Sequence, residues 1–266
     1  MDAAAEQSIG FFQALRHRQR IIHTLVLREI KIQLRTSKLG YLIVLAEPAA
    51  QFAIMFTIFS FVGHQPSYGT SLGLFLATGL IPFVMFMHLA QRTMRAVRIA
   101  KTVARIPNVN VIDNAIARAF LEYLTLVFIT LVVFTTLVFI GLAPIPAHPS
   151  VLISAMLAIG LAGFGTGLVN GVLTHLSRAY AMVWSVASRS MLFFSGVFYT
   201  PSSLPPTARD IVLWNPILHG LEWFRAGIFD SYPTGSLSRT YLVLFGVSTL
   251  TLGLMLLRVF SGKLMR

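Results

Sequence analysis

LWNPILHGLEWFRAGIF, residues 213–229, lies between two long apolar segments and decides how the rest of the chain is interpreted. His219, Glu222 and Arg225 make this stretch too polar to cross a bilayer unaided. Its remaining side chains make it too apolar for a loop in water. Short apolar stretches of this kind are often re-entrant or interfacial. The stretch therefore predicts a helix that enters the membrane from one side and does not span it.

Helix signals around this stretch predict a re-entrant pair of short helices over residues 202–229. TPSSLPP, residues 200–206, is a strong helix breaker, and a first short helix is expected over 207–214. Asn215 is a good helix cap and Pro216 suits the first helical position, so a second helix should follow. The polar backbone between the two helices must face protein or water. We therefore expect the pair to lie at the outer mouth of a pathway.

His219, Glu222 and Arg225 are spaced by three in the second of these helices. Buried ionic groups must be paired, so we expect these side chains to form a self-satisfied polar cluster that holds the pair. Contact with a substrate that leaves outward is the alternative.

The composition of the whole chain is that of an integral membrane protein. Hydrophobic residues make up 56% of the 266 residues, charged residues only 11%, and the mean hydropathy is +0.75. A soluble domain carries about a quarter charged residues. The chain has no cysteine, which excludes disulfides, thiolate metal sites and cysteine nucleophiles. Its 21 Lys and Arg against 9 Asp and Glu are typical of cytoplasmic loop anchors, so no nucleic acid partner is expected.

Six segments are apolar over the roughly 20 residues that a transmembrane helix needs. The predicted fold is all-α, with residues 1–266 forming a single transmembrane domain. The first long apolar run begins only near Leu39, so the N-terminus is not expected to be a cleaved signal. The predicted spans are Leu42–Val62, Leu72–Gln91, Ala115–Ile140, Val151–Leu173, Ala179–Val197 and Tyr241–Phe260.

Basic residues are divided unevenly among the connections between these spans. The segment before the first span, the connection after the second and the C-terminal tail are rich in Lys and Arg, whereas residues 63–71 and 141–150 hold none. Positive charge marks the cytoplasmic side of a membrane protein. Both termini are therefore predicted to be cytoplasmic, which agrees with an even number of spans. The 213–229 stretch then falls on the outer side.

Residues 11–38 are predicted to form an amphipathic helix on the membrane surface. Their basic residues recur every three or four positions and share one helical face, opposite a face of Ile and Leu. Such a helix anchors on anionic lipid, and the same face offers a docking surface for a cytoplasmic partner. The basic face holds Arg20, Arg28, Lys31, Arg35 and Lys38.

Residues 92–105 are predicted to extend the second span into the cytoplasm as a helix that ends at Pro107. Spacings of three distribute the charges around the helix axis. This pattern fits a short solvated helix, and it fits equally a lever that contacts another subunit. The charges are Arg92, Arg95, Arg98, Lys101 and Arg105.

Arg189 is the most informative charge inside a predicted span. It follows Arg178 by eleven residues, which puts it roughly 16 Å deeper and near the middle of the bilayer. A charge at that depth needs a partner or water. Two interpretations stay open: a cation that lines the pathway of an anionic substrate, or one that pairs with a carboxylate on a neighbouring helix.

Two other charged positions have local interpretations. Glu47 precedes Pro48 in the first span, where a proline frees a backbone carbonyl and bends the helix. Arg118 and Glu122 are expected to form an i, i+4 ion pair near the inner end of the third span.

Two residue types repeat along the spans. Gly163, Gly167 and Gly171 step by four and give a flat stripe on which another helix packs closely, in this chain or in another. Phenylalanines recur on helical faces of the first two spans, where they are packing residues or a stacking path for sugar rings. They are Phe52, Phe56, Phe59, Phe75 and Phe86.

Catalytic signatures do not occur in the sequence. There is no G-x-x-x-x-G-K-[ST] phosphate loop, because the Gly262-Lys263 pair is followed by Leu264. There is also no H-E-x-x-H and no G-x-S-x-G. The chain is therefore predicted not to be an enzyme, and any ATP that drives it is bound by another chain.

Three motifs resemble one known family. They are LGY at 39–41 leading to EP at 47–48, FSGVFY at 194–199, and NPILHGLEWFR at 215–225. Over nearly its whole length the chain resembles the membrane subunit of bacterial ATP-binding-cassette exporters of surface polysaccharide. These are of ABC-2 type, and the capsule exporters of Gram-negative bacteria are the most similar.

The resemblance implies an inner-membrane homodimer of six-span subunits with two separate ATPase subunits, which bind the ATP and Mg. It implies that residues 11–38 and 92–105 are the interface and coupling helices. A channel between the two copies would carry a lipid-linked, often acidic polysaccharide to a periplasmic adaptor and an outer-membrane conduit. The residues then expected at the ATPase contact are Arg28, Lys31, Arg35, Arg98, Lys101 and Arg105.

On this interpretation basic residues meet the anionic lipid head or acidic sugars, and aromatic residues let sugar rings slide. The expected pathway residues are Arg189, Arg92, Arg95, Arg98, Phe52, Phe56, Phe59 and Phe86. No metal site and no cofactor of its own is expected. An exporter of O-antigen, teichoic acid or a small lipophilic compound is one alternative. A membrane enzyme or scaffold that transports nothing is another.

Overall fold

The computed structural model describes residues 11–36, 40–63, 65–69, 71–100 and 110–264; the side chains of residues 11–15, 17, 32–36 and 40–49 lie outside the description. All regular structure in these residues is helical. In chain order the elements are α1 (Phe11–Thr36), α2 (Gly40–Phe61), α3 (Leu72–Arg98), α5 (Val111–Phe139), α6 (Pro149–Leu176), α7 (Arg178–Phe194), a 3₁₀ turn (Pro201–Ser203), α8 (Pro206–Val212), α9 (Pro216–Ile228), α10 (Arg239–Val259) and α11 (Ser261–Leu264).

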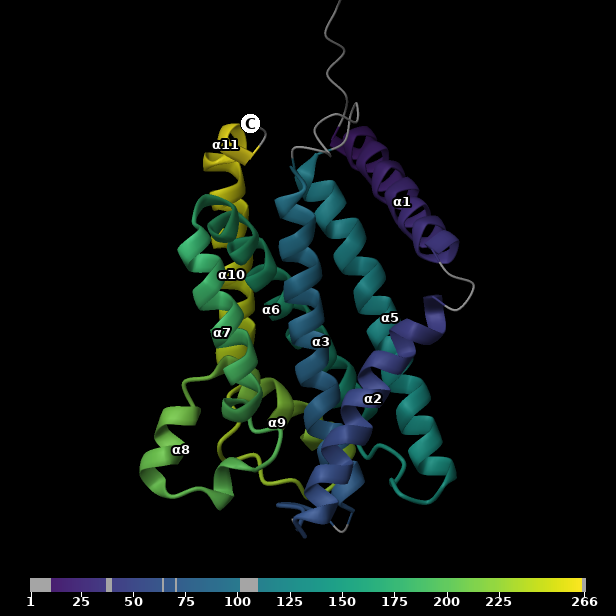
Figure 1. Cartoon of the computed structure of the whole chain (residues 1–266), viewed down its shortest axis with the longest axis vertical. Coiled ribbons are helices and arrows are strands. Elements are labelled where there is room, and N and C mark those ends of the chain that lie inside the picture. The colour runs from purple at the N-terminus through teal and green to yellow at the C-terminus, as the bar shows by residue number, and fades with distance from the viewer. Residues whose placement is uncertain (1–10, 37–39, 64, 70, 101–109, 265–266) are drawn as a thin grey trace, which may run out of the picture.

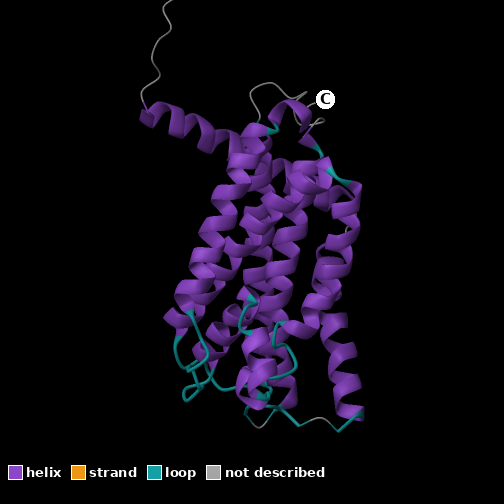
Figure 2. Cartoon of the chain, turned by 90° about the vertical axis from the view of Figure 1, so that its left-hand side faces the viewer, coloured by secondary structure: helices purple, strands orange, loops and turns teal. Residues whose placement is uncertain are grey.

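The long helices α2, α3, α5, α6, α7 and α10 run along one axis in alternating directions (Figure 1). α1 and α11 lie at the same end of this bundle, while α8, α9 and most of the loops lie at the other end (Figures 1 and 2). Within the described part of the chain, α3, α5, α6 and α10 are long and apolar enough to cross a membrane. α7, with 17 residues, and the described apolar part of α2, Ala50–Phe61, are shorter, so the count of six spans stays a prediction.

The glycine stripe of α6 packs against α3 of the same chain. The sequence had left open whether the neighbouring helix came from this chain or from another. A Cβ atom added to Gly163 would lie 2.9 Å from the backbone oxygen of Phe86. One added to Gly167 would lie 2.5 Å from Cβ of Thr93, and one on Gly171 2.6 Å from Cβ of Val97. Two helices can approach this closely only where one of them carries no side chain. The glycines at every fourth position of α6 therefore allow α3 and α6 to pack in direct contact.

A second glycine contact joins α6 to α10. A Cβ atom on Gly165 would lie 2.6 Å from the backbone nitrogen of Leu250, and one on Gly253 of α10 would lie 2.6 Å from Cβ of Leu168. α6 is thus held between α3 and α10 by small residues on two of its faces. The three helices form the packed centre of the subunit.

α1 lies along the first half of α5 and is held there by two ion pairs (Figure 1). Arg18 reaches Asp113 at 3.3 Å, and Glu29 reaches Arg118 at 3.1 Å. Asp113 also accepts a hydrogen bond from the backbone N–H of Asn110, so it caps α5 while it binds α1. The predicted surface helix is therefore attached to the third predicted span rather than free on the membrane.

Several helix ends differ from the predictions by a few residues. α7 ends at Phe194, three residues before the predicted end, because Gly196 takes a left-handed backbone conformation with φ +75° that a helix cannot continue through. α3 ends at Arg98, and the predicted extension toward Lys101 and Arg105 lies outside the described residues, as do Lys38 and the terminal Pro107.

Candidate functional site

α9, the second helix of the pair predicted over residues 202–229, is buried in the bundle. All its residues from Ile217 to Ile228 are buried, and it packs against α3, α6 and α10. Asn215 caps it as predicted, with its side-chain oxygen accepting the N–H of Ile217 at 3.0 Å, and Pro216 takes the first helical position. The amide nitrogen of Asn215 donates to the backbone oxygen of Phe194 at 3.1 Å. One side chain therefore joins the end of α7 to the start of α9.

Arg225 lies at the centre of the contacts around α9, with 0% of its surface exposed. Its guanidinium donates to the backbone oxygens of Val197 at 3.1 Å and Tyr199 at 3.2 Å, and lies 4.3 Å from the centroid of the Phe75 ring. It also meets Glu222 at 3.4 Å. A guanidinium with five donors suits carbonyls left unpaired beyond a helix end. Arg225 therefore holds the segment after α7 against α3 and α9.

Glu222 receives hydrogen bonds from the chain that follows α9. The Tyr232 hydroxyl donates to it at 2.6 Å and the Ser236 hydroxyl at 3.4 Å. Tyr232 lies in the connection between α9 and α10, where burial raises the pKa of its hydroxyl, so the group stays protonated and remains a donor. The carboxylate is thus paired on both sides and contributes to the fold.

His219 does not join this pair. Its Nε2 lies 3.0 Å from the backbone oxygen of Leu213, and its Nδ1 accepts the N–H of Ser238 at 3.2 Å. Both ring nitrogens are therefore occupied, with the proton on Nε2. Glu222 and Arg225 thus form a pair without His219, and all three side chains are at most 4% exposed. Of the polar atoms of these three side chains, Nε of Arg225 is the one that is buried without a hydrogen-bond partner.

α8 and α9 differ in burial. α8 projects from the bundle (Figure 1), and Ile211 and Trp214 at its end are 70% and 80% exposed. Apolar side chains this exposed suit a membrane interface. Only α9 enters the protein interior.

Arg118 and Glu122 do not form the predicted local ion pair, and that expectation was wrong. Arg118 pairs with Glu29 of α1, while Glu122 contacts Nδ1 of His88 and Nε of Arg92, both on α3 and both at 3.2 Å. Glu122 is 5% exposed and needs partners inside the bundle, whereas Arg118 points toward α1. A spacing of four gives proximity, but buried partners on other helices compete more strongly.

The arginines predicted to line the pathway therefore differ in exposure and in whether a carboxylate pairs with them. Arg92 is neutralised by Glu122. Arg95 is exposed and donates to Gln91 at 3.3 Å, and Arg98 is exposed. Arg189 is exposed on α7, and no carboxylate within the described side chains forms an ion pair with it. The structural-pair interpretation of Arg189 finds no partner in that part of the chain.

The aromatic residues also divide into two groups. Phe52 and Phe56 stack at 6.1 Å, and Phe59 stacks on Phe198 at 4.7 Å, which joins α2 to the segment after α7. Phe56 is 41% exposed. Phe86 is 2% exposed in the core between α3 and α6, so its assignment to a pathway is corrected to packing.

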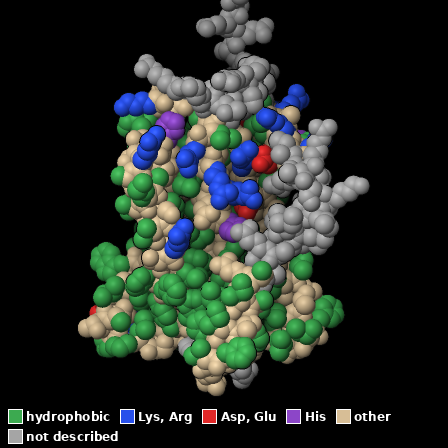
Figure 3. Space-filling model, in the orientation of Figure 1, with side chains coloured by type: hydrophobic (Ala, Val, Ile, Leu, Met, Phe, Trp, Pro, Cys, Tyr) green, Lys and Arg blue, Asp and Glu red, His purple; other side chains and the backbone are tan. Residues whose placement is uncertain are grey.

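Charge is distributed along the long axis of the molecule. Lys and Arg side chains gather over the half that carries α1 and α11, while hydrophobic side chains cover the other half (Figure 3). Arg28 and Lys31 of α1 are exposed in the charged half. The side chains of Arg35, Glu47 and Pro48, and residues Lys101 and Arg105 altogether, lie outside the description.

Several residues that hold the structure together were missed by the sequence analysis: Glu29, His88, Asp113 and Tyr232. Glu29 is the one acidic residue between Phe11 and Thr36, which was a usable signal for a partner on another helix. The others carried no pattern, since their partners come from distant segments. Among the described residues, no group of His, Asp and Glu forms a metal site.

Comparison with known proteins assigns the chain to a family. The model of the ABC-2 type transporter family matches residues 20–229, most of the chain. The chain belongs to the ABC-2 type transporter family. ABC-2 proteins of this kind are membrane subunits of ABC transporters and are not themselves enzymes. The resemblance inferred from the sequence motifs is therefore confirmed at the level of the family.

Relatives match this ABC-2 protein along nearly their whole length. It is 30% identical to the polysialic acid transport protein KpsM of Escherichia coli, over 89% of this chain and 92% of that protein. It is 26% identical to the capsule polysaccharide export inner-membrane protein CtrC of Neisseria meningitidis serogroup B, over 95% of each chain. It is 25% identical to BexB of Haemophilus influenzae, of the same description, over 94% of this chain and 95% of that one.

Proposed function

We propose that this chain is the transmembrane subunit of an ATP-driven exporter that moves a lipid-linked, acidic capsular polysaccharide across the bacterial inner membrane. The observation that carries the proposal is the similarity, end to end, to membrane proteins named for polysialic acid transport and capsule polysaccharide export. The exposed Arg189 on an apolar helix fits an anionic substrate, because a charge inside a span requires water or an opposite charge.

In this proposal both termini are cytoplasmic. On the face drawn in Figure 3, Lys and Arg side chains gather over the half with α1 and α11, and basic residues favour the cytoplasmic side. α8 and α9 then lie on the periplasmic side, near the adaptor and the outer-membrane conduit that receive the polymer.

The second copy of the chain in the proposed homodimer covers α7. No described residue of α7 is buried, and Met182, Val183 and Val186 are 65–71% exposed. Arg189 lies on the same helix, so a dimer formed across α7 encloses a cation in its interface. This is where a channel for an anionic polymer between the copies would run, with Phe56 and Phe59 of α2 nearby as apolar surfaces.

Two separate ATPase subunits bind ATP and Mg and drive the transport, while this chain supplies no cofactor. We place their contacts at the exposed basic face of α1, including Arg28 and Lys31, and at Arg98 with the connection after it. α1 is joined to α5 through Arg18–Asp113 and Glu29–Arg118, so a displacement of α1 carries α5 with it. Arg95 and Arg98 at the inner end attract the anionic head of the incoming lipid.

The test is deletion of this chain in a strain that keeps its polymer-synthesis enzymes. Lipid-linked glycan should accumulate inside the cell and surface polymer should disappear, and the purified chain should carry a stoichiometric ATPase. Accumulation of a lipid-linked O-antigen or teichoic acid would move the substrate to those polymers. Normal surface polymer, with no co-purifying ATPase, would reject the exporter in favour of a membrane enzyme or scaffold.

A further inference from the structure

His88 and Arg92 lie one turn apart on α3, and a single carboxylate of α5 holds both of them. Nδ1 of His88 lies 3.2 Å from Oε1 of Glu122, and Nε of Arg92 lies 3.2 Å from Oε2 of the same residue. Side chains four residues apart on a helix are neighbours on one face. The carboxylate therefore places the imidazole ring and the guanidinium group side by side, because each contacts one of its two oxygens.

Glu122 uses one nitrogen of each side chain and leaves the other nitrogens unpaired. Among the described residues, no other hydrogen bond or ion pair reaches Nε2 of His88 or the two terminal nitrogens of Arg92. The side chains of His88 and Arg92 are 24% and 40% exposed, whereas that of Glu122 is 6% exposed. The unpaired nitrogens are not buried, and they are therefore accessible from outside the chain.

The ion pair at the α9 end of the bundle shows how a closed cluster differs from this one. Arg225 is 0% exposed, and its terminal nitrogens donate to Glu222 and to the backbone oxygens of Val197 and Tyr199. Those nitrogens are used up in holding the chain together. The open nitrogens around Glu122 hold no other part of the described chain, which leaves them available for a ligand.

The two open ends offer different hydrogen-bonding groups. An oxygen of Glu122 accepts from Nδ1, so that nitrogen carries the proton and Nε2 of the neutral His88 ring is an acceptor. The terminal nitrogens of Arg92 are donors in a planar fork that matches a carboxylate. A ligand that fits both presents a carboxylate to Arg92 and a hydroxyl to His88. An acidic sugar carries these two groups close together.

A phosphate group fits the same place less well. Its oxygens would face the lone pair on Nε2 of His88, and the charge of Arg92 is already offset by Glu122. Exposed arginines without a carboxylate partner among the described side chains lie nearer the end of α3, at Arg95 and Arg98. A nearly neutral site also suits a passing polymer, which must bind and then leave.

The position of the site along α3 places it within the length of a membrane span. His88 lies ten residues before Arg98, the last residue of α3, which is roughly 15 Å along the helix axis. α3 is one of the described helices that are long and apolar enough to cross a membrane. Polar groups at such a depth are costly unless they have a partner or water.

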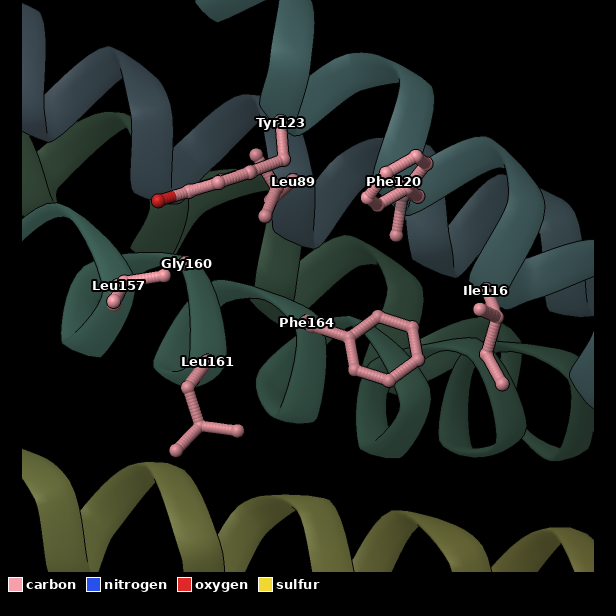
Figure 4. A pocket seen from close by; sticks show the side chains of 9 residues that line it. Leu89, Ile116, Phe120, Tyr123, Leu157, Gly160, Leu161 and Phe164 are labelled. Carbon is pink, nitrogen blue, oxygen red and sulfur yellow. The ribbon is translucent and has the colours of Figure 1, made fainter. Parts of the chain in front are cut away.

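The groove between α5 and α6, next to this site, has a different lining. Phe120, Leu157 and Phe164 make it apolar, and Tyr123 supplies the one side-chain hydroxyl among its lining residues (Figure 4). A sugar in the groove would give up hydrogen bonds to water without replacing them. The polar face of α3 is therefore the better place for a sugar.

We propose that His88 and Arg92 form a binding site for an acidic sugar of the transported polymer, and that Glu122 is the positioning residue that holds them. The inference rests on the proposed function, since a transported polymer is what brings sugars to this depth. It names the group that is recognised as a sugar carboxylate with a neighbouring hydroxyl, and not the phosphate of the lipid carrier.

The first experiment uses the intact complex of this chain with its ATPase in proteoliposomes, and the lipid-linked glycan purified from the deletion strain. ATP hydrolysis is measured against glycan concentration, for the native glycan and for the same glycan with its carboxylates converted to methyl esters. Esterification should raise the half-saturating concentration roughly tenfold, because the charged hydrogen bonds to Arg92 are lost. Equal half-saturating concentrations, or a native glycan without carboxylates, would overturn the proposal and leave the exporter itself in place.

Competition separates the sugar from the phosphate. Acidic oligosaccharide cut from the glycan, and free of lipid, should inhibit the glycan-stimulated ATP hydrolysis, whereas glycerol phosphate at the same concentration should not. Inhibition by glycerol phosphate as strong as that by the oligosaccharide would assign the site to the phosphate of the lipid and overturn the proposal. No inhibition by the oligosaccharide would overturn it as well.

Variants of the two ligand-binding residues form the second experiment. Arg92→Gln should raise the half-saturating concentration of the native glycan roughly tenfold and abolish its difference from the ester, and His88→Phe should raise it roughly fivefold. Arg258→Gln and His175→Phe are the matched controls, both at exposed positions, and should leave it unchanged. Equal effects of the variants and their controls would overturn the site.

Glu122→Gln tests the positioning role. Without the carboxylate, Arg92 regains its full charge and holds the sugar longer, so the half-saturating concentration and the maximal rate should both fall. A purely structural role would lower the amount of folded complex and leave the half-saturating concentration of the remainder unchanged, which would overturn the role of Glu122. If the variants fail to fold, the comparison of native and esterified glycan on the wild-type complex still decides.

Discussion

α6 and α7 are neighbours in the chain, both carry apolar and small residues, and they are used in opposite ways. In the apolar part of α6, 61% of the residues are buried, and glycines bring α3 and α10 into backbone contact with it. No described residue of α7 is buried, although Met182, Val183 and Phe193 are large and apolar. α6 is therefore part of the packed interior of one subunit, whereas the surface of α7 is available for contact with lipid or another chain.

The difference lies in what each helix carries at its contact face. Glycine on α6 permits close packing within the chain and leaves no space for a substrate between α6 and its neighbours. Arg189 on α7 makes close packing within one chain unfavourable, since a buried cation needs a partner.

The largest effect is expected at Arg225, which ties the end of α7 to the packed interior. Arg225→Met removes the cationic member of a buried ion pair, leaves Glu222 with only the Tyr232 and Ser236 hydroxyls, and leaves the backbone oxygens of Val197 and Tyr199 without this donor. We expect a loss of about 3–5 kcal/mol in the free energy of unfolding, measured by thermal denaturation in detergent. The same change at the exposed Arg258 should have little effect. Equal stability of both variants would mean that the end of α7 is held by other contacts.

The next effect is expected in the glycine stripe of α6. Gly167→Leu puts a side chain where the added Cβ alone lies 2.5 Å from Thr93, so α3 and α6 must separate. Overpacking costs about 1–3 kcal/mol, visible as a lower midpoint of thermal unfolding. Ala179→Leu at an exposed position of α7 should leave the midpoint nearly unchanged. If the two leucines had the same effect, the contrast between α6 and α7 would be lost.

A smaller effect is expected where α1 meets α5. Glu29→Arg and Arg118→Glu each break the partly buried ion pair and should each cost up to about 1 kcal/mol. The double variant restores the pair with its charges exchanged and should recover part of the loss. A double-mutant cycle measured on unfolding and on ATP-driven export tests this. Additive losses in both assays would mean that the pair does not link α1 to α5.

The smallest effect on stability is expected at Arg189, together with a large effect on export. Arg189→Gln should change the free energy of unfolding by no more than about 0.5 kcal/mol, because its side chain is exposed and has no described carboxylate partner. Surface polymer should fall while ATPase assembly persists, and Arg189→Lys should retain export by keeping the charge. Unchanged surface polymer in the glutamine variant would remove Arg189 from the pathway.

Local signals predicted much of the helix architecture. The segment expected as Tyr241–Phe260 is α10, Arg239–Val259, and Asn215 with Pro216 starts α9 where a cap and a first-turn proline favour it. These predictions depend on the apolar length of a segment and on the residues at its ends, which are properties of neighbouring positions. The fold class followed from the same information, whereas the family was inferred from the resemblance of three motifs at 39–48, 194–199 and 215–225.

Partners across helices could not be predicted in this way. The spacing of Arg118 and Glu122 was compatible with a local pair, yet their partners are Glu29 on α1 and His88 with Arg92 on α3. Phe86 carried the same aromatic signal as Phe56, and only packing distinguishes the buried ring from the exposed one. The sequence does not show which residues pair or become buried, because both depend on how whole helices are placed relative to one another.

The sequence by itself determined that this is a helical membrane protein of the ABC-2 kind, with a glycine stripe, a capped outer helix and a charge in an apolar segment. Only the tertiary structure decided that the glycines face α3, that Arg225 and Glu222 are enclosed, and that Arg189 is left exposed. Apolar length and end residues are properties of consecutive positions and can be seen in the order of residues. Burial and pairing arise when helices far apart in the chain meet, and they depend on three-dimensional proximity.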